Sequence, residues 1–587
     1  MGLMQSAVET YDAMNGLVGV IQEGKEPLAP VGHLCTRAAI EITITKEGRF
    51  VSAQKVEQKI IIPVTEESAG RTSRPAAHPL CEQIGYLIGE DKRKTELYLN
   101  QLAEWKDTIP NESLEAVYSY VSGGTIRDDL LELNFLSVEN GSVKNDKDLI
   151  CWRIVGLDHG ESAVWTDRKL HSEFIEYYLK KKETDGEQVS MISGNREAPA
   201  SQHLKGVVAL AGNAKLISSN DTTNFTYLGR FLSSEEALSV GYLDSQKAHN
   251  ALKWVIANQG VMVGKREFVC WNPEGIEVQD PLGALLGRSE QGREPGEYKR
   301  DLFLTVMGMK NNLKNRKVVI ASFEAATSGR LAVTYFNEFQ GSDYLDRLQF
   351  WDETFCWNDG WSGTWSPGLK EIVRFAFGVQ RGNDDNAKVE VDEQILGMQI
   401  QRLLLCRTEK AVFPSDIERA LVNKCFNPLS YNARNRRRLQ FITCAAIRKY
   451  RLDRFKEDWE MALEPERKDR SYQYGRLLAV MEKAERDTYD SDEKREPYAI
   501  RLQSIFTRRP AYATRTIVEQ LKTAYYPKLS IGQRTYYEKL IGEILTIISN
   551  LEADEYNKPL SETYLLGYYL QKNAFYTKKT TKNEEDK

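Results

Sequence analysis

Residues that could carry out catalysis are few in this chain and stand apart from one another. The chain has six histidines, and the dipeptide Asp158-His159 resembles one element of a metal-dependent phosphohydrolase site. Such a site needs further His and Asp ligands, and none can be assigned, so we interpret the dipeptide as a loop before Gly160. The chain also lacks the GxxxxGK[ST] phosphate loop, the GxGxxG fingerprint and the GxSxG nucleophile elbow.

A run of acidic residues offers the other candidate chemistry. Its members are Asp384, Asp385, Glu390, Asp392 and Glu393. Because Mg²⁺ prefers several carboxylate oxygens, one interpretation is a magnesium-dependent nuclease that uses this run. The run lies in the break between the two halves of the chain, which favours a solvated linker instead. We therefore predict a protein that is not an enzyme and that holds no metal and no cofactor.

Residues suited to nucleic-acid binding are more numerous. Arg71-Thr72-Ser73 comes shortly before Gln83. Arginine donates a fork of hydrogen bonds and glutamine both donates and accepts, so the two can read the edges of bases. The alternative for this segment is an ordinary junction between a loop and a helix.

A basic stripe extends from residue 431 to residue 456. One acid, Asp453, stands there against nine basic residues: Arg434, Arg436, Arg437, Arg438, Arg448, Lys449, Arg451, Arg454 and Lys456. The formal net charge of the chain is −5, but a local stripe can still bind a phosphate backbone. The alternative is a solvated helix face whose charges pair with acids elsewhere.

The elements that must position these residues divide the chain by pattern. Residues 1–380 mix strand and helix signals, with a hairpin from Ile42 to Phe50 and two strands within 318–336 that flank Ser328-Gly329. From residue 381 to 587 the pattern is that of long amphipathic helices, including 394–407, 434–456, 472–486, 536–551 and 562–575. The sequence predicts an α+β protein: a mixed α/β N-terminal region followed by an all-α helical bundle.

Composition narrows the class further. Hydrophobic residues make up 41% and charged residues 28% of the chain, which is typical of a globular protein. The eight cysteines are scattered without a CxxC pair, which argues against a zinc site or a disulfide framework and fits a reducing cytoplasm. No apolar run is long enough for a membrane span, and the N-terminus has no signal-peptide pattern. We predict a cytoplasmic protein without a membrane partner.

Two C-terminal stretches carry the most specific pattern. They are Ser471–Lys483 and Tyr564–Lys572, both helical in period, and their composition predicts helices that pack closely at a glycine and present Arg, Gln and Lys along one edge. These stretches resemble the C-terminal signature of the large subunit of type I-C CRISPR surveillance complexes (Cascade). Arg71-Thr72-Ser73 with Leu80–Gln83, and Ser328–Val333, are similar to further blocks of that Csd-type family, although Glu82-Gln83 stands where the family has Asp-Asn.

The resemblance implies a non-catalytic scaffold subunit of an RNA-guided antiviral complex. Such a subunit recognises a short motif, the PAM, in foreign double-stranded DNA, supports duplex opening and R-loop formation, and recruits a helicase–nuclease. The implied partners are CRISPR RNA, target DNA and the backbone and RNA-processing subunits. The residues that we expect to read the PAM are Arg71, Thr72, Ser73, Gln83, Asn213, Lys215 and Asn220. A generic nucleic-acid-binding scaffold remains the other alternative.

The resemblance also implies a second product of the same gene. Type I-C systems resemble one another in making a separate small subunit from an internal start, and Met461 directly precedes the strongest signature block. We therefore predict a start at Met461 and a small subunit of residues 461–587, while Met398 or a non-Met codon stays an alternative. The basic residues Arg434, Arg436, Arg437, Arg438, Arg448, Lys449 and Arg451 are expected to contact a nucleic-acid backbone.

Overall fold

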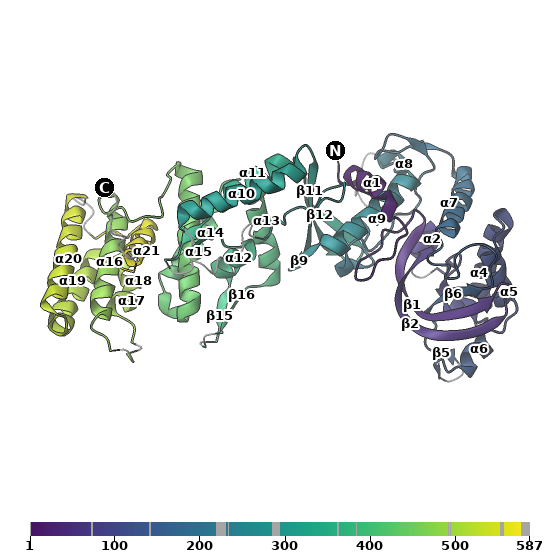
Figure 1. Ribbon diagram of the computed structural model, residues 1–587, viewed down its shortest axis with the longest axis horizontal. Coiled ribbons are helices and arrows are strands. Elements are labelled where there is room, and N and C mark those ends of the chain that lie inside the picture. Colours follow the sequence, from purple (N-terminus) through teal and green to yellow (C-terminus); the bar gives the residue numbers. More distant parts are fainter. Residues whose placement is uncertain are drawn as a thin grey trace, which may run out of the picture. The chain divides into compact units, whose positions relative to one another are not determined.

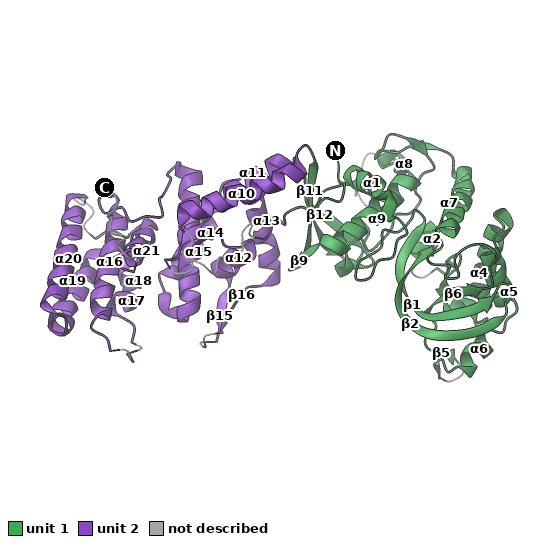
Figure 2. Cartoon of the chain, viewed as in Figure 1, with its two compact units in different colours: residues 1–278, 316–339 green, residues 279–315, 340–587 purple. Residues whose placement is uncertain are grey.

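The computed structural model describes most of the chain. The described residues are 2–71, 74–139, 142–218, 231–232, 234–283, 294–360, 363–382, 384, 386–490, 492–493, 495–551 and 557–576. The chain forms two compact units, coloured separately in Figure 2: residues 1–278 with 316–339, and residues 279–315 with 340–587. None of the helices in the described part of the chain has the length and hydropathy that a membrane span requires.

The first sheet of the first unit is built on a long hairpin (Figure 1). Strands β1 (His33–Thr45) and β2 (Phe50–Pro63) are antiparallel, so the predicted hairpin forms. Its turn uses Gly48 at φ +75°, where a Cβ would lie 2.8 Å from the carbonyl oxygen of Ala116. The short strand β3 (Glu82–Gln83) and strand β6 (Leu149–Val155) complete the sheet in the order β2-β1-β6-β3, with β6 parallel to β1.

Helices with one apolar face complete this part of the first unit. They are α1 (Leu3–Ala13), α2 (Glu66–Gly70), α3 (Ile84–Leu87), α4 (Lys92–Thr108), α5 (Glu112–Ser122), α6 (Ile126–Glu132), α7 (Arg168–Lys182), α8 (Ser234–Ala237) and α9 (Tyr242–Gln259). Helix α4 shows why they fold: Tyr98, Leu102 and Trp105 are spaced three or four residues apart and are all fully buried. The ring of Trp105 meets that of Phe174 on α7 edge to face, with centroids 4.9 Å apart.

A second sheet and two ribbons complete the first unit. The sheet has the order β12-β11-β10-β9, and its strands are β9 (Val261–Val263), β10 (Arg266–Trp271), β11 (Lys317–Thr327) and β12 (Arg330–Gln340). The strands predicted on either side of Ser328-Gly329 are therefore present as β11 and β12. The ribbons are β4 (Val138–Glu139) with β5 (Ser142–Val143), and β7 (Gln188–Val189) with β8 (Arg196–Glu197).

The second unit is mainly helical. Its helices are α10 (Pro295–Leu313), α11 (Gly341–Thr354), α12 (Leu369–Phe377), α13 (Glu393–Glu409), α14 (Ser415–Cys425), α15 (Ala433–Phe455), α16 (Arg470–Arg486), α17 (Tyr498–Arg501), α18 (Gln503–Arg508), α19 (Pro510–Gln520), α20 (Ile531–Leu551) and α21 (Thr563–Ala574). Its strands are β13 (Trp357–Asn358), β14 (Thr364–Trp365), β15 (Val379–Arg381) and β16 (Lys388–Glu390). Sheets in the N-terminal half and helices toward the C-terminus confirm the predicted α+β class.

The two units do not meet at the single position that the sequence indicates. The change of pattern suggested a boundary between residues 380 and 381, whereas the second unit already includes residues 279–315 and resumes at residue 340. The reason is that α10 and α11 pack against each other, and α11 and α12 pack against α13. The strands β11 and β12 lie between α10 and α11 in sequence, so their strand signal extended the mixed region too far along the chain.

The two signature stretches form the closest helix pair of the second unit. A Cβ on Gly475 of α16 would lie 1.9 Å from the carbonyl oxygen of Tyr564, and one on Gly567 of α21 would lie 2.0 Å from that of Tyr472. Such distances are far inside van der Waals contact, so both positions require glycine. Helices α16 and α21 thus cross backbone to backbone, as their sequences predict.

Candidate nucleic-acid interface

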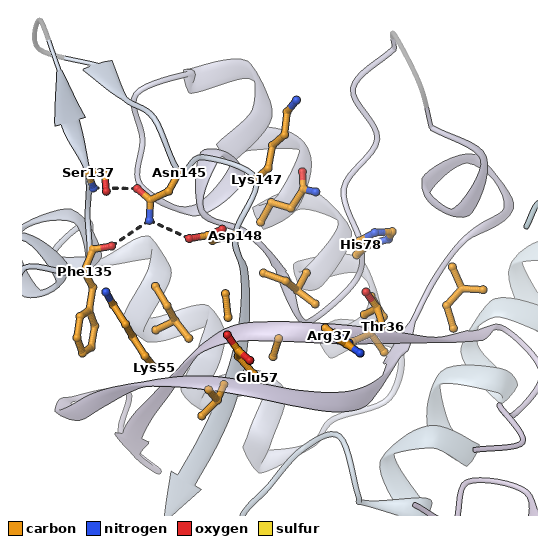
Figure 3. Close-up of a pocket in the computed structure, with 18 of the residues that line it drawn as sticks. Thr36, Arg37, Lys55, Glu57, His78, Phe135, Ser137, Asn145, Lys147 and Asp148 are labelled. Carbon is orange, nitrogen blue, oxygen red and sulfur yellow. Dashed lines mark hydrogen bonds between the residues drawn. The ribbon is translucent and has the colours of Figure 1, made fainter. Parts of the chain in front are cut away.

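A cavity of about 720 Å³ lies over the first sheet and gathers side chains from three parts of the first unit. Figure 3 shows Arg37 on β1, and Lys55 and Glu57 on the neighbouring strand β2. The loop of residues 134–149 contributes the facing wall, and residues 71–83 contribute Arg71, His78 and Gln83. The structure therefore brings two of the predicted PAM-reading residues to one hollow.

The loop that forms the facing wall is held by a single amide. Asn145 donates from its amide nitrogen to the carbonyl oxygen of Phe135 and to the carboxylate of Asp148, both at 3.0 Å. Its amide oxygen accepts from the backbone N–H of Ser137 at 2.9 Å (Figure 3). Because these bonds use both ends of the amide, Asn145 fixes the shape of the loop.

Arg71 has a structural partner inside the protein. Its guanidinium forms a bidentate ion pair with Glu82, with Nη1–Oε2 at 2.5 Å and Nη2–Oε1 at 2.8 Å, and also donates to the carbonyl oxygen of Ala76 at 2.8 Å. The Glu82 side chain is fully buried and also accepts from the backbone N–H of His78. The guanidinium lies 4.9 Å from the ring centroid of Tyr86. Its fork is therefore occupied by Glu82, and Arg71 positions the segment rather than presenting a fork to a base.

Gln83 is the residue that this ion pair positions. Its backbone N–H donates to Glu82 Oε1 at 2.6 Å, and its strand, β3, pairs with Leu149 and Ile150 of β6. The side chain is half-buried and lines the cavity. Among the residues that the structure describes, its amide has no hydrogen-bond partner. Gln83 thus presents an unused donor and acceptor from a fixed backbone.

Two lysines lie near this segment without an acidic partner in the described chain. Lys205 donates from Nζ to the carbonyl oxygen of Arg71 at 3.1 Å, and the backbones of Lys205 and Lys215 form a β-bridge. Burial, together with a neighbouring cation in each case, lowers the pKa of both lysines. Asn213 is exposed two residues before Lys215. The predicted residues Thr72, Ser73 and Asn220 lie outside the described residues.

The basic stripe falls on α15 and divides into three groups. Arg434, Arg437, Arg454 and Lys456 are exposed. Three others are half-buried and paired with acids: Arg436 with Glu496 at 2.6 Å, Arg451 with Glu562 at 2.7 Å, and Arg438 with Glu371. The guanidinium of Arg438 also stacks 3.5 Å from the ring centroid of Trp365. Pairing with distant acids is the alternative that the sequence left open.

Arg448 and Lys449 lie in the interior, which corrects their placement on an outward-facing stripe. The Arg448 side chain is 4% exposed and donates to the carbonyl oxygens of Trp459 at 2.9 Å and Glu353 at 3.0 Å. The Lys449 side chain is 1% exposed and lies 2.9 Å from Asp453, and burial lowers its pKa. A helix of 23 residues turns every third or fourth side chain inward, and here two of those positions hold cations.

The candidate catalytic residues make local contacts. Asp384 accepts from the backbone N–H of Asn386, Asp392 caps α13, and Glu390 lies 3.8 Å from Arg381. Asp385 lies outside the described residues. Asp158 pairs with Lys46 at 3.0 Å. Within the described ranges, no group of three or more His, Cys, Asp or Glu side chains is placed to hold a metal ion.

The polar residues of the signature stretches also face inward. Arg476 is 4% exposed and donates to the Gln571 side chain at 3.0 Å and to the carbonyl oxygen of Pro465 at 2.6 Å. Glu482 is buried between Tyr568, Lys572 and Arg486. Burial would raise the pKa of Glu482, but Lys572 and Arg486 outweigh it and lower that pKa to about 2. The edge of Arg, Gln and Lys expected at the surface is a buried network instead.

Three cations of the cavity were not singled out from the sequence. Arg37, Lys55 and Lys147 line it, are exposed, and have no acidic partner among the described residues. They stand up to 110 positions apart in the chain, so no local pattern marks them. Only the alternation of strands β1 and β2 could have placed Arg37 and Lys55 on one sheet.

These features define an α+β protein of two compact units, with a cavity of cationic and amide groups in the first unit and a helical second unit. Residues 8–576 match the family described as CRISPR-associated protein (Cas_Csd1), so the chain belongs to that family. No curated protein matches the chain. The family inferred from the signature stretches is thereby confirmed.

Proposed function

We propose that this protein is the non-catalytic large subunit of a type I-C RNA-guided antiviral complex. In this role it recognises the PAM in foreign double-stranded DNA, supports duplex opening and R-loop formation, and recruits the helicase–nuclease that degrades the target. Guide pairing supplies the sequence specificity, while the protein reads the short motif and contributes backbone contacts. Membership of the CRISPR-associated family supports this role.

The observation that carries the proposal is the unpaired amide of Gln83 beside a cationic hollow. A side-chain amide can make two hydrogen bonds to one base edge, provided that its backbone is fixed. The ion pair of Arg71 with Glu82 supplies that fixation, because both Gln83 and His78 donate their backbone N–H groups to Glu82. Lys205 and Lys215 are half-buried cations without an acidic partner in the described chain, and a phosphate oxygen would satisfy them.

The experiment compares DNA binding by complexes assembled with different large subunits. Gln83→Ala should weaken binding to a duplex with the correct motif by roughly 5- to 150-fold, equivalent to about 1–3 kcal/mol for a lost base contact. Binding to a scrambled duplex should change little. Gln22→Ala is the matched control, because Gln22 is exposed in the same unit and does not line the cavity. Equal losses on both duplexes would contradict a reading role for Gln83.

The proposed partners are CRISPR RNA, target DNA, the backbone and RNA-processing subunits and the recruited helicase–nuclease. The exposed residues Arg434 and Arg437 of α15 are the candidates for a phosphate contact with the displaced strand or the guide. The large subunit itself is proposed to have no nuclease activity. Purified chain incubated with Mg²⁺ or Mn²⁺ should leave DNA and RNA intact, and metal-dependent cleavage by this chain would support the alternative of a nuclease at the Asp384–Glu393 run.

A small subunit translated from Met461 is part of the same proposal. Met461 lies in the segment between α15 and α16, so a start there cuts no helix. Helix α16 packs against α19, α20 and α21, all of which follow Met461, so residues 461–587 contain a core of their own. Expression of the untagged gene and mass spectrometry of the assembled complex should detect a fragment of about 14–15 kDa. Its absence would leave α16–α21 as part of the long chain only.

A further inference from the structure

The cavity over the first sheet has three layers of different chemistry. The floor consists of buried residues, among them Ala38, Ile40 and Leu149. Burial lowers the pKa of His78, also on the floor, to about 4, so its imidazole is neutral at neutral pH. Above the floor, the half-buried wall carries the unpaired amide of Gln83.

The rim adds charge and one aromatic ring. Arg37, Lys55 and Lys147 are exposed there without an acidic partner in the described part of the chain. Figure 3 shows Phe135 beside Lys55, and the ammonium of Lys55 lies 5.9 Å from the ring centroid. Apolar floor, amide wall and cationic rim therefore follow one another from the inside outward.

We propose that this cavity binds a single unpaired nucleotide. A nucleobase has a flat apolar face, an edge of donors and acceptors, and a phosphate attached at one end. Bases stack on aromatic rings, amides pair with base edges, and lysine and arginine bind phosphates. The three layers of the cavity match these three parts in the order in which a nucleotide would enter with its base first.

Size and charge exclude the other ligand classes. A volume of about 720 Å³ lies within the range of roughly 300–1,000 Å³ that holds one small ligand, so a duplex does not enter. A metal ion is disfavoured because the lining has only two carboxylates, Glu57 and Asp148, against the three cations of the rim and Arg71. A wholly apolar ligand would leave the rim charges and the Gln83 amide without partners.

The nucleotide is supplied by the DNA strand that loses its partner where the duplex opens beside the motif. This source rests on the proposed function, in which Gln83 reads the motif next to the opening. Withdrawing one unpaired nucleotide into the cavity prevents it from re-pairing and so favours strand exchange, which is otherwise nearly balanced. The rim cations hold the phosphates of that nucleotide and its neighbour at the mouth.

The test uses assembled complex and target duplexes that carry 2-aminopurine at one position at a time beside the motif. This base fluoresces more strongly when it leaves the stack, so one position should brighten several-fold while its neighbours change little. Ala39→Phe projects a ring from the cavity lining and should abolish that signal. Lys147→Ala should reduce it several-fold. Lys144→Ala is the matched control, because Lys144 lies in the same loop and is exposed but does not line the cavity.

The outcomes separate this inference from the proposed function. Motif discrimination by the wild-type complex without a bright position would overturn the nucleotide pocket and leave motif reading intact. Loss of discrimination by the wild-type complex would refute the proposed function itself. An unchanged signal in Ala39→Phe, in a variant whose melting temperature matches wild type, would also overturn the pocket. If deoxyadenosine monophosphate binds the full chain in calorimetry while every duplex position stays dark, the strand is not the source and the inference fails.

Discussion

The ion pair of Arg71 with Glu82 allows a structural role to be separated from base reading. Arg71→Ala removes three donated hydrogen bonds and leaves the carboxylate of Glu82, with a fully buried side chain, without its cation. Breaking a buried pair from one side costs about 3–5 kcal/mol. The free energy of opening the segment from His78 to Leu87 should fall by that amount, and β3 should lose its fixed place beside β6.

Hydrogen exchange measured by mass spectrometry is the suitable assay, because it follows this segment alone and does not require both units to unfold together. A loss of about 3–5 kcal/mol corresponds to exchange that is faster by roughly 150- to 5,000-fold in peptides covering 78–87. Arg127→Ala is the control: its pair with Glu90 is about one third exposed on each side and spans 3.4 Å. Such a surface pair contributes about 0–1 kcal/mol.

A second variant fixes the sign of the argument. Replacing both partners, Arg71→Ala with Glu82→Ala, removes the unpaired charge, so exchange should be slower than in Arg71→Ala alone. If Arg71 instead served to read bases, Arg71→Ala would weaken motif binding while exchange in 78–87 stayed at the wild-type rate. That result would refute the positioning role assigned to Arg71.

Three further predictions concern the helical unit. Gly475→Ala should destabilise it by about 1–3 kcal/mol or more, because its Cβ would overlap the carbonyl oxygen of Tyr564; Gly542→Ala on α20, with open space around it, should be neutral or stabilising in the same urea titration. Because the pKa of Glu482 is lowered to about 2, its contribution of about 3 kcal/mol is present above pH 4.5 and lost as the pH falls toward 2, and Glu482→Gln should flatten this part of the stability profile. Arg434→Ala with Arg437→Ala should reduce the slope of log affinity against log salt by roughly 0.7–0.9 per lost phosphate contact; an unchanged slope would make α15 a solvated face.

Local patterns were sufficient to predict the elements but not the partners of their side chains. The hairpin from Ile42 to Phe50 and the helix at 434–456 follow from alternation and from a 3.6-residue period, so both were predicted close to their observed bounds. The acids that neutralise α15 could not be predicted, because Glu371, Glu496 and Glu562 stand 60 to 111 positions from their arginines. A one-dimensional charge count registers a basic stripe where the folded chain has ion pairs.

The candidate site was predicted only in part, for a related reason. Arg71 and Gln83 were recognised because they lie close together in the sequence and resemble a family block. That Arg71 is used by Glu82 follows only from the burial of the carboxylate, and the sequence reveals burial only as a period, not as a partner. Gln83 differs from Arg71 in this respect, because its backbone is held by the same carboxylate while its side chain stays unused.

The contrast between Arg71 and Gln83 recurs in the second unit. The stretches that identify the family, around Gly475 and Gly567, make backbone contacts that only glycine permits, and the polar residues beside them are buried. These positions are constrained by packing, which makes them recognisable, but they do not face a ligand. Surfaces able to contact nucleic acid consist of exposed side chains on separate strands and loops, where packing imposes little constraint. The recognisable part of this sequence therefore identifies the scaffold, and the binding residues have to be located from the fold.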